Sequence, residues 1–125
     1  MLPITTWLTV LLGLLFLILT ARVILQRMNK RIAFDHGEDK ALRGAIRAHM
    51  NWVEQAPFFL IAFALAEYRG VWAWWLVLIG VLFLFGRVVN GLGMSQGIHN
   101  ARVVGTVTNL ISLILILGTL IFSLI

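Results

Sequence analysis

The chain has 125 residues, of which 61% are hydrophobic and 12% are charged, and its mean hydropathy is +0.98. Soluble domains contain roughly 45–50% apolar residues, so the composition excludes a water-soluble protein and predicts a single membrane domain over residues 1–125. There is no cysteine, which excludes disulfides, thiolate metal sites and a cysteine nucleophile.

Four long stretches with few charges predict an all-α fold, a bundle of four transmembrane helices over about residues 2–31, 39–68, 71–97 and 100–125. Each stretch approaches or exceeds the roughly 17–25 residues that cross a hydrocarbon core about 30 Å thick. The first stretch does not fit a secretory signal, because its basic residues follow the apolar segment and do not precede it.

Local signals predict details of these helices. Asp39 is expected to cap the start of the second helix through its carboxylate. Pro57 lies inside that helix and predicts a bend, because proline has no N–H for the helical hydrogen bond. Gly93 and Gly97 in the third helix have the spacing of a small-residue pair that packs closely in membranes.

The positions of the ten Lys and Arg residues predict the topology. Only Arg69 lies at the second connection, and the other nine lie in or beside the first and third connections. Positive charge gathers on the cytoplasmic side of membrane proteins, so we expect a multi-pass protein of a bacterial inner membrane with both termini periplasmic. This placement also accounts for the net charge of +5, so no nucleic acid partner is expected.

A stripe of polar residues runs along the second helix. Arg47, Asn51 and Glu54 follow the spacing i, i+4, i+7, which places them on one face. A carboxylate inside a membrane costs a few kcal/mol, so Glu54 should face a partner or a cavity. Arg87 and Asn90 of the third helix lie at comparable depth and are the expected neighbours.

Two interpretations of this cluster stay open. One is a buried Arg87–Glu54 ion pair that only orders the bundle. The other is a polar pocket, open to the cytoplasm, for a small and multiply charged anion. We expect that pocket to be lined by Arg27, Arg47, Asn51, Glu54, Arg87, Asn90 and Arg102. No metal site is expected, because the histidines and carboxylates do not converge.

The helix-two pattern resembles a motif of the MAPEG family, the membrane-associated proteins in eicosanoid and glutathione metabolism. The residues that carry the resemblance are Arg47, Asn51, Glu54 and Pro57, which read RxxxNxxExxP. Arg87, preceded by Phe85 and Gly86 and followed by Asn90, is similar to the start of the family's third-helix motif. The resemblance spans nearly the whole chain.

This resemblance implies a homotrimer whose active sites lie between subunits near the cytoplasmic face. It implies glutathione as cofactor and a transferase or peroxidase reaction on small lipophilic electrophiles that enter from the membrane lipid. By analogy, Arg47, Asn51 and Glu54 hold the charged ends of glutathione. Arg27 and Arg87 add positive charge, and Asn90 is a further glutathione-binding residue. Arg102 is the catalytic candidate that stabilises the thiolate.

The chain departs from the family pattern at two positions. Several eukaryotic members carry tyrosines where this chain has Met94 and Gln55, and Tyr68 lies at the opposite membrane face. Ser95 is the hydroxyl available near the pocket. Two other functions therefore stay open: a non-catalytic protein that binds a lipid headgroup or partner in the same pocket, and a small multidrug-type transporter. The transporter is disfavoured because such carriers have their glutamate in the first helix and a weak charge bias.

Overall fold

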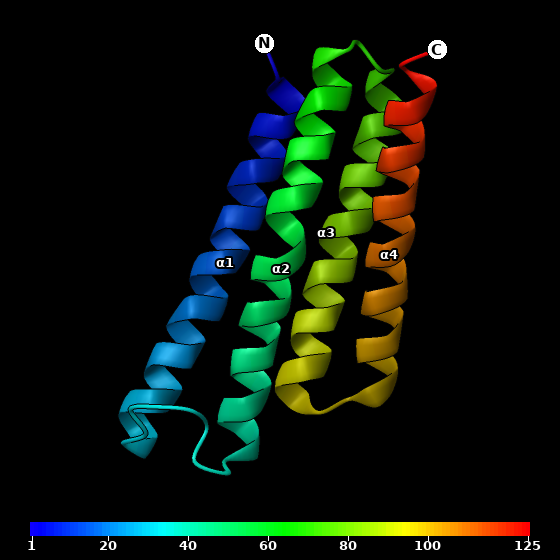
Figure 1. The fold of residues 1–125 in the computed structure, drawn as a ribbon. Coiled ribbons are helices and arrows are strands. Elements are labelled where there is room, and N and C mark those ends of the chain that lie inside the picture. The colour runs from blue at the N-terminus through cyan, green and yellow to red at the C-terminus, as the bar shows by residue number, and fades with distance from the viewer.

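The computed structural model describes residues 1–125 as four helices: α1 (Pro3–Lys30), α2 (Lys40–Tyr68), α3 (Ala73–Gln96) and α4 (His99–Phe122). Successive helices run antiparallel, so both termini and the α2–α3 turn lie at one end, here called the terminal end (Figure 1). The α1–α2 and α3–α4 connections lie at the other end, the loop end. The predicted all-α, four-helix fold is confirmed.

Short-range signals determine where these helices begin and end. The Asp39 carboxylate accepts the Leu42 backbone N–H at 2.8 Å and the Lys30 ammonium at 2.5 Å, as predicted for a capping residue. Gly97 ends α3 with a φ of 70°, a left-handed conformation that glycine adopts without steric cost. Nothing lies within 4 Å of the position where a Gly97 side chain would start. Of the predicted pair, therefore, only Gly93 packs against another helix.

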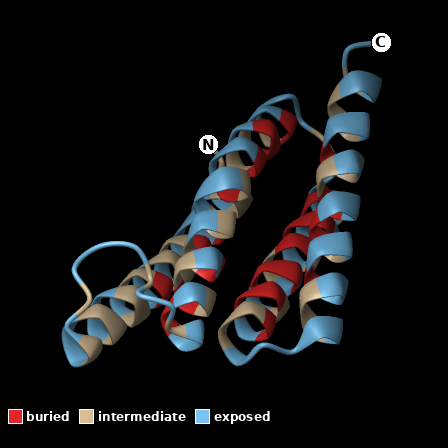
Figure 2. Cartoon of the chain, turned by 60° about the horizontal axis from the view of Figure 1, so that its bottom comes forward, coloured by how far each residue is buried: buried red, intermediate tan, exposed pale blue.

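An apolar core fills the half of the bundle near the terminal end. Phe59 of α2 and Phe83 of α3 stack with 3.7 Å between ring centroids and 3° between planes. Buried residues concentrate along α3 and the facing side of α2, whereas α1 and α4 expose most of their surface (Figure 2). Lipid tails are as apolar as this core, so close packing, and not exclusion of water, stabilises it in a membrane.

In the loop half, the backbones of α3 and α4 touch. A Cβ on Gly105 would lie 2.5 Å from the backbone nitrogen of Asn90, and a Cβ on Gly93 would lie 2.6 Å from that of Arg102. Only glycine permits this approach. The contact brings Asn90 of α3 directly against the first turns of α4.

At the terminal end, charged side chains of α2 and the α2–α3 turn hold the two chain ends. The Glu67 carboxylate accepts the backbone N–H groups of Ile4 at 2.9 Å and Thr5 at 2.7 Å, and also the Thr5 hydroxyl. These N–H groups belong to the first turn of α1 and have no partner within that helix. Arg69 donates to the hydroxyl of Ser123 at 2.8 Å and to its carbonyl oxygen.

Three of the helices, α1, α3 and α4, are long and apolar enough to cross a membrane. The fourth, α2, has 29 residues but is more polar because it carries the Arg47, Asn51 and Glu54 stripe. It packs against all three other helices and runs antiparallel to α1 and α3 (Figure 1). The polar stripe of α2 therefore lies alongside the apolar helices α1 and α3.

Candidate functional site

The polar stripe of α2 opens onto the surface of the chain. Arg47 and Glu54 are exposed and Asn51 is half-buried, and Glu54 takes part in neither of the chain's two ion pairs. The stripe borders a hollow of about 370 Å³, here called the stripe hollow. Its lining consists of Arg47, Met50, Asn51, Glu54, Met94 and Thr106. Pockets for small ligands measure about 300–1,000 Å³, so this hollow is of suitable size.

A second hollow, of about 230 Å³, adjoins the first on α4 and is here called the Arg102 hollow. It shares Met94 and Thr106 with the stripe hollow and adds His99, Arg102, Val103 and Val107. The Nε of Arg102 is buried without a hydrogen-bond partner. One surface therefore runs from the Glu54 carboxylate to the Arg102 guanidinium.

Arg87 lies behind the stripe and does not face either hollow. Its side chain is only 3% exposed. Its guanidinium donates to the Asn51 carbonyl oxygen at 2.8 Å and to the Gln55 Oε1 at 2.9 Å. The predicted Arg87–Glu54 ion pair is wrong, because the side chain that contacts Arg87 is that of Gln55. Adjacent residues on a helix point about 100° apart, so Gln55 points inward and Glu54 points outward.

Asn90 connects three helices beneath the hollows. It is 2% exposed, and its Oδ1 accepts the Asn51 side-chain N–H at 2.6 Å. Its own side-chain nitrogen donates to the Thr106 hydroxyl oxygen at 3.0 Å and to the Arg102 carbonyl oxygen at 3.4 Å. Because the Asn51 nitrogen is engaged with Asn90, the Asn51 Oδ1 is left to accept hydrogen bonds from a ligand.

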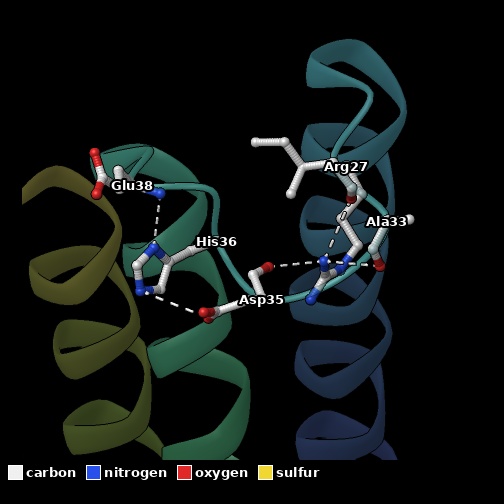
Figure 3. Close-up of polar contacts among 6 residues, drawn as sticks. Arg27, Ala33, Asp35, His36 and Glu38 are labelled. Carbon is white, nitrogen blue, oxygen red and sulfur yellow. Dashed lines mark hydrogen bonds and ion pairs between the residues drawn. The ribbon is translucent and has the colours of Figure 1, made fainter.

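Arg27 lies outside both hollows and holds the α1–α2 loop. Its guanidinium donates to three backbone carbonyl oxygens, those of Ile32 at 3.4 Å, Ala33 at 3.2 Å and Asp35 at 2.8 Å (Figure 3). The loop in turn borders a third hollow of about 260 Å³ whose lining includes Arg47. The other lining residues are Asp35, His36, Arg43 and Ile46. Arg27 therefore holds the loop that lies beside Arg47.

Two hydroxyl groups are placed differently from the sequence-based expectation. Ser95 donates to the Gly91 carbonyl oxygen at 2.7 Å and accepts from Arg22 at 2.7 Å, so it joins α3 to α1 and lines neither hollow. Thr106 was not predicted, yet it lines both hollows. The available signal was its position four residues after Arg102, which places both side chains on one face of α4.

The three long apolar helices and the polar cluster buried between the helices define an integral membrane protein with a polar site inside its bundle. The chain belongs to the MAPEG family, whose model matches residues 5–122. This confirms the resemblance drawn from the helix-two motif.

Two curated relatives carry the name inner membrane protein YecN, one from Escherichia coli strain K12 and one from Escherichia coli O6:H1. Each is 30% identical to this chain over 80 residues, which is 64% of this chain and 61% of the relative. The match thus covers less than two thirds of the relatives' length. It supports a location in the inner membrane. No solved structure matches the chain.

Proposed function

We propose that this protein binds glutathione in the stripe and Arg102 hollows and uses it in a transferase or peroxidase reaction on lipophilic electrophiles. The observation that carries the proposal is the continuous surface on which Arg47, Glu54 and Arg102 present their side chains. Membership of the MAPEG family supports the choice of ligand.

The chemistry of the surface complements that of glutathione, which carries two carboxylates, one ammonium and a thiol. The Arg47 guanidinium suits a carboxylate, because it offers paired N–H donors. The Glu54 carboxylate and the Asn51 Oδ1 accept hydrogen bonds from an ammonium or a peptide N–H. Arg102 lies farther along the same surface and supplies a cation. A cation close to a thiol lowers the pKa of that thiol.

An assembly of several chains completes the site in this proposal. A charged group in contact with lipid costs a few kcal/mol, and Glu54 is exposed on the single chain. In a homotrimer, a neighbouring subunit covers this face of α2 and closes the hollows against lipid. The loop half, which carries nine of the ten basic residues, is the cytoplasmic half, and both termini are periplasmic.

The test is calorimetric titration of glutathione into the purified protein in detergent. Charge-assisted hydrogen bonds contribute about 1.5–3 kcal/mol, so Arg47→Ala and Glu54→Gln should each weaken binding about 10- to 100-fold. Lys40→Ala is the matched control, because it removes an exposed cation of the same helix that lines none of the three hollows. The control should bind as the wild type does.

Three results separate the possible outcomes. Absence of binding at millimolar glutathione, or equal weakening by Lys40→Ala, contradicts the proposal. Binding without turnover of a model electrophile supports only the glutathione-binding part. A third outcome is that the wild type does not bind glutathione, and that phospholipid co-purifies with it but not with Arg47→Ala. This outcome favours a headgroup-binding protein instead.

A further inference from the structure

Thr106 has the only serine or threonine hydroxyl that donates no hydrogen bond within the chain. Thr5 donates to the Glu67 carboxylate. Each of the other serine and threonine hydroxyls donates to a backbone carbonyl three or four residues earlier. Such bonds are the usual arrangement for these residues in helices. The Thr106 hydroxyl proton is the exception, because it has no acceptor within the chain.

The network around Thr106 determines how its hydroxyl is used. Its Oγ1 accepts the side-chain N–H of Asn90 at 3.0 Å, and Asn90 is buried and also bonded to Asn51. Thr106 is therefore an acceptor toward the protein interior. The single hydroxyl proton stays available on an exposed side chain that borders both the stripe hollow and the Arg102 hollow.

No other hydroxyl group is available at this surface. Met94, which lines the same two hollows, has a thioether and no proton to donate. The Ser95 hydroxyl is engaged with Gly91 and Arg22, and Tyr68 lies at the terminal end of α2. Beside Thr106, the Arg102 hollow is lined by Arg102, whose buried Nε has no hydrogen-bond partner.

We infer that Thr106 is a catalytic residue of the proposed reaction, and that its hydroxyl donates a hydrogen bond to the thiolate sulfur of bound glutathione beside Arg102. The inference rests on the proposed function. The thiol S–H bond breaks, the electron pair stays on sulfur, and the proton passes to water in the open hollow. Thr106 keeps its own proton and shares it with the sulfur. A donor to the charged form lowers the pKa of the thiol.

The test measures the thiol pKa of bound glutathione from the ultraviolet absorbance of its thiolate as a function of pH. Thr106→Val keeps the side-chain shape but removes the hydroxyl, both as donor and as acceptor of the Asn90 N–H, and it should raise this pKa by about one to two units. Thr106→Ser restores the hydroxyl and should restore the wild-type value. Thr108→Val is the control on the same helix, because its hydroxyl is bonded to the Val104 carbonyl and lines neither hollow.

The outcomes distinguish this inference from the proposed function. If the wild type binds glutathione and Thr106→Val leaves the thiol pKa unchanged, Thr106 has only a structural role and the inference is overturned, while the proposed function stands. If the wild type binds no glutathione, both fall. Thr106→Ala, which places no extra methyl group against Asn90, replaces the valine variant if that protein does not fold, and the same pKa rise is expected.

Discussion

Replacement of Gly105 by alanine perturbs the close contact of α3 and α4 beneath the site. The added Cβ would lie 2.5 Å from the Asn90 backbone nitrogen, whereas ordinary contacts begin at 3.4 Å. The helices must therefore separate locally by about 0.9 Å, the difference of these two distances. Overpacking of this kind costs about 1–3 kcal/mol. The same movement lengthens the 3.0 Å bond from Asn90 to Thr106 beyond normal hydrogen-bond distance.

Gly118→Ala provides the matched control on the same helix. Nothing lies within 4 Å of a Cβ at Gly118, so this variant gains only the helix preference of alanine over glycine, about 1 kcal/mol. Both variants share that gain, so the difference in their free energies of unfolding isolates the clash at Gly105. Denaturant unfolding in detergent, followed by circular dichroism, should show Gly105→Ala to be less stable by about 1–3 kcal/mol. Equal stability of the two variants would refute the reasoning.

Two further predictions concern buried and loop polar groups. Gln55→Leu removes the side-chain acceptor of buried Arg87 and should destabilise the protein by about 1–3 kcal/mol in the same assay. Adding Arg87→Met should recover part of the lost stability, because no unpaired charge then remains. A double variant no more stable than Gln55→Leu would contradict the stabilising role of the Arg87–Gln55 hydrogen bond. Asp39 has a pKa below its ordinary value of 3.8 because it accepts hydrogen bonds from Lys30 and Leu42. Its ionised form therefore stabilises the fold above that value, and the contribution is lost as the pH falls through the lowered pKa. Asp39→Asn should have a lower melting temperature than the wild type at pH 7 and the same one at strongly acidic pH, and a constant difference across this range would exclude the charge as the cause.

The fold could be predicted from the sequence because its signals are local. Each helix contains a long apolar stretch that is visible in the sequence. Asp39 caps α2, as predicted from its carboxylate and its place just before that stretch. The glycines of the third helix predicted close helix packing there, but they did not identify α4 as the partner. The partner glycine on α4, Gly105, carried no signal of its own, because contact between helices depends on their relative rotation as well as on composition.

The partners of the polar groups could be predicted less well. Charge alone favoured Glu54 as the partner of Arg87, yet Gln55 is the residue that α2 turns toward α3. One step along a helix changes the direction of a side chain by about 100°, so the rotation of α2 about its axis decides between the two. That rotation is set by packing over the whole helix. Arg27 was likewise expected in the pocket, and its actual partners are carbonyl groups of a loop whose path the sequence does not specify.

The rotation of α2 also separates the polar groups of the loop half into two sets. Arg87 and Asn90 are buried, and their hydrogen bonds are made to amide and hydroxyl groups within the chain. Arg47 and Glu54 are turned outward and take part in no ion pair. Exposure of the second set to lipid would cost several kcal/mol. A ligand or a second subunit bound to this face of α2, as in the proposed site, would remove that cost.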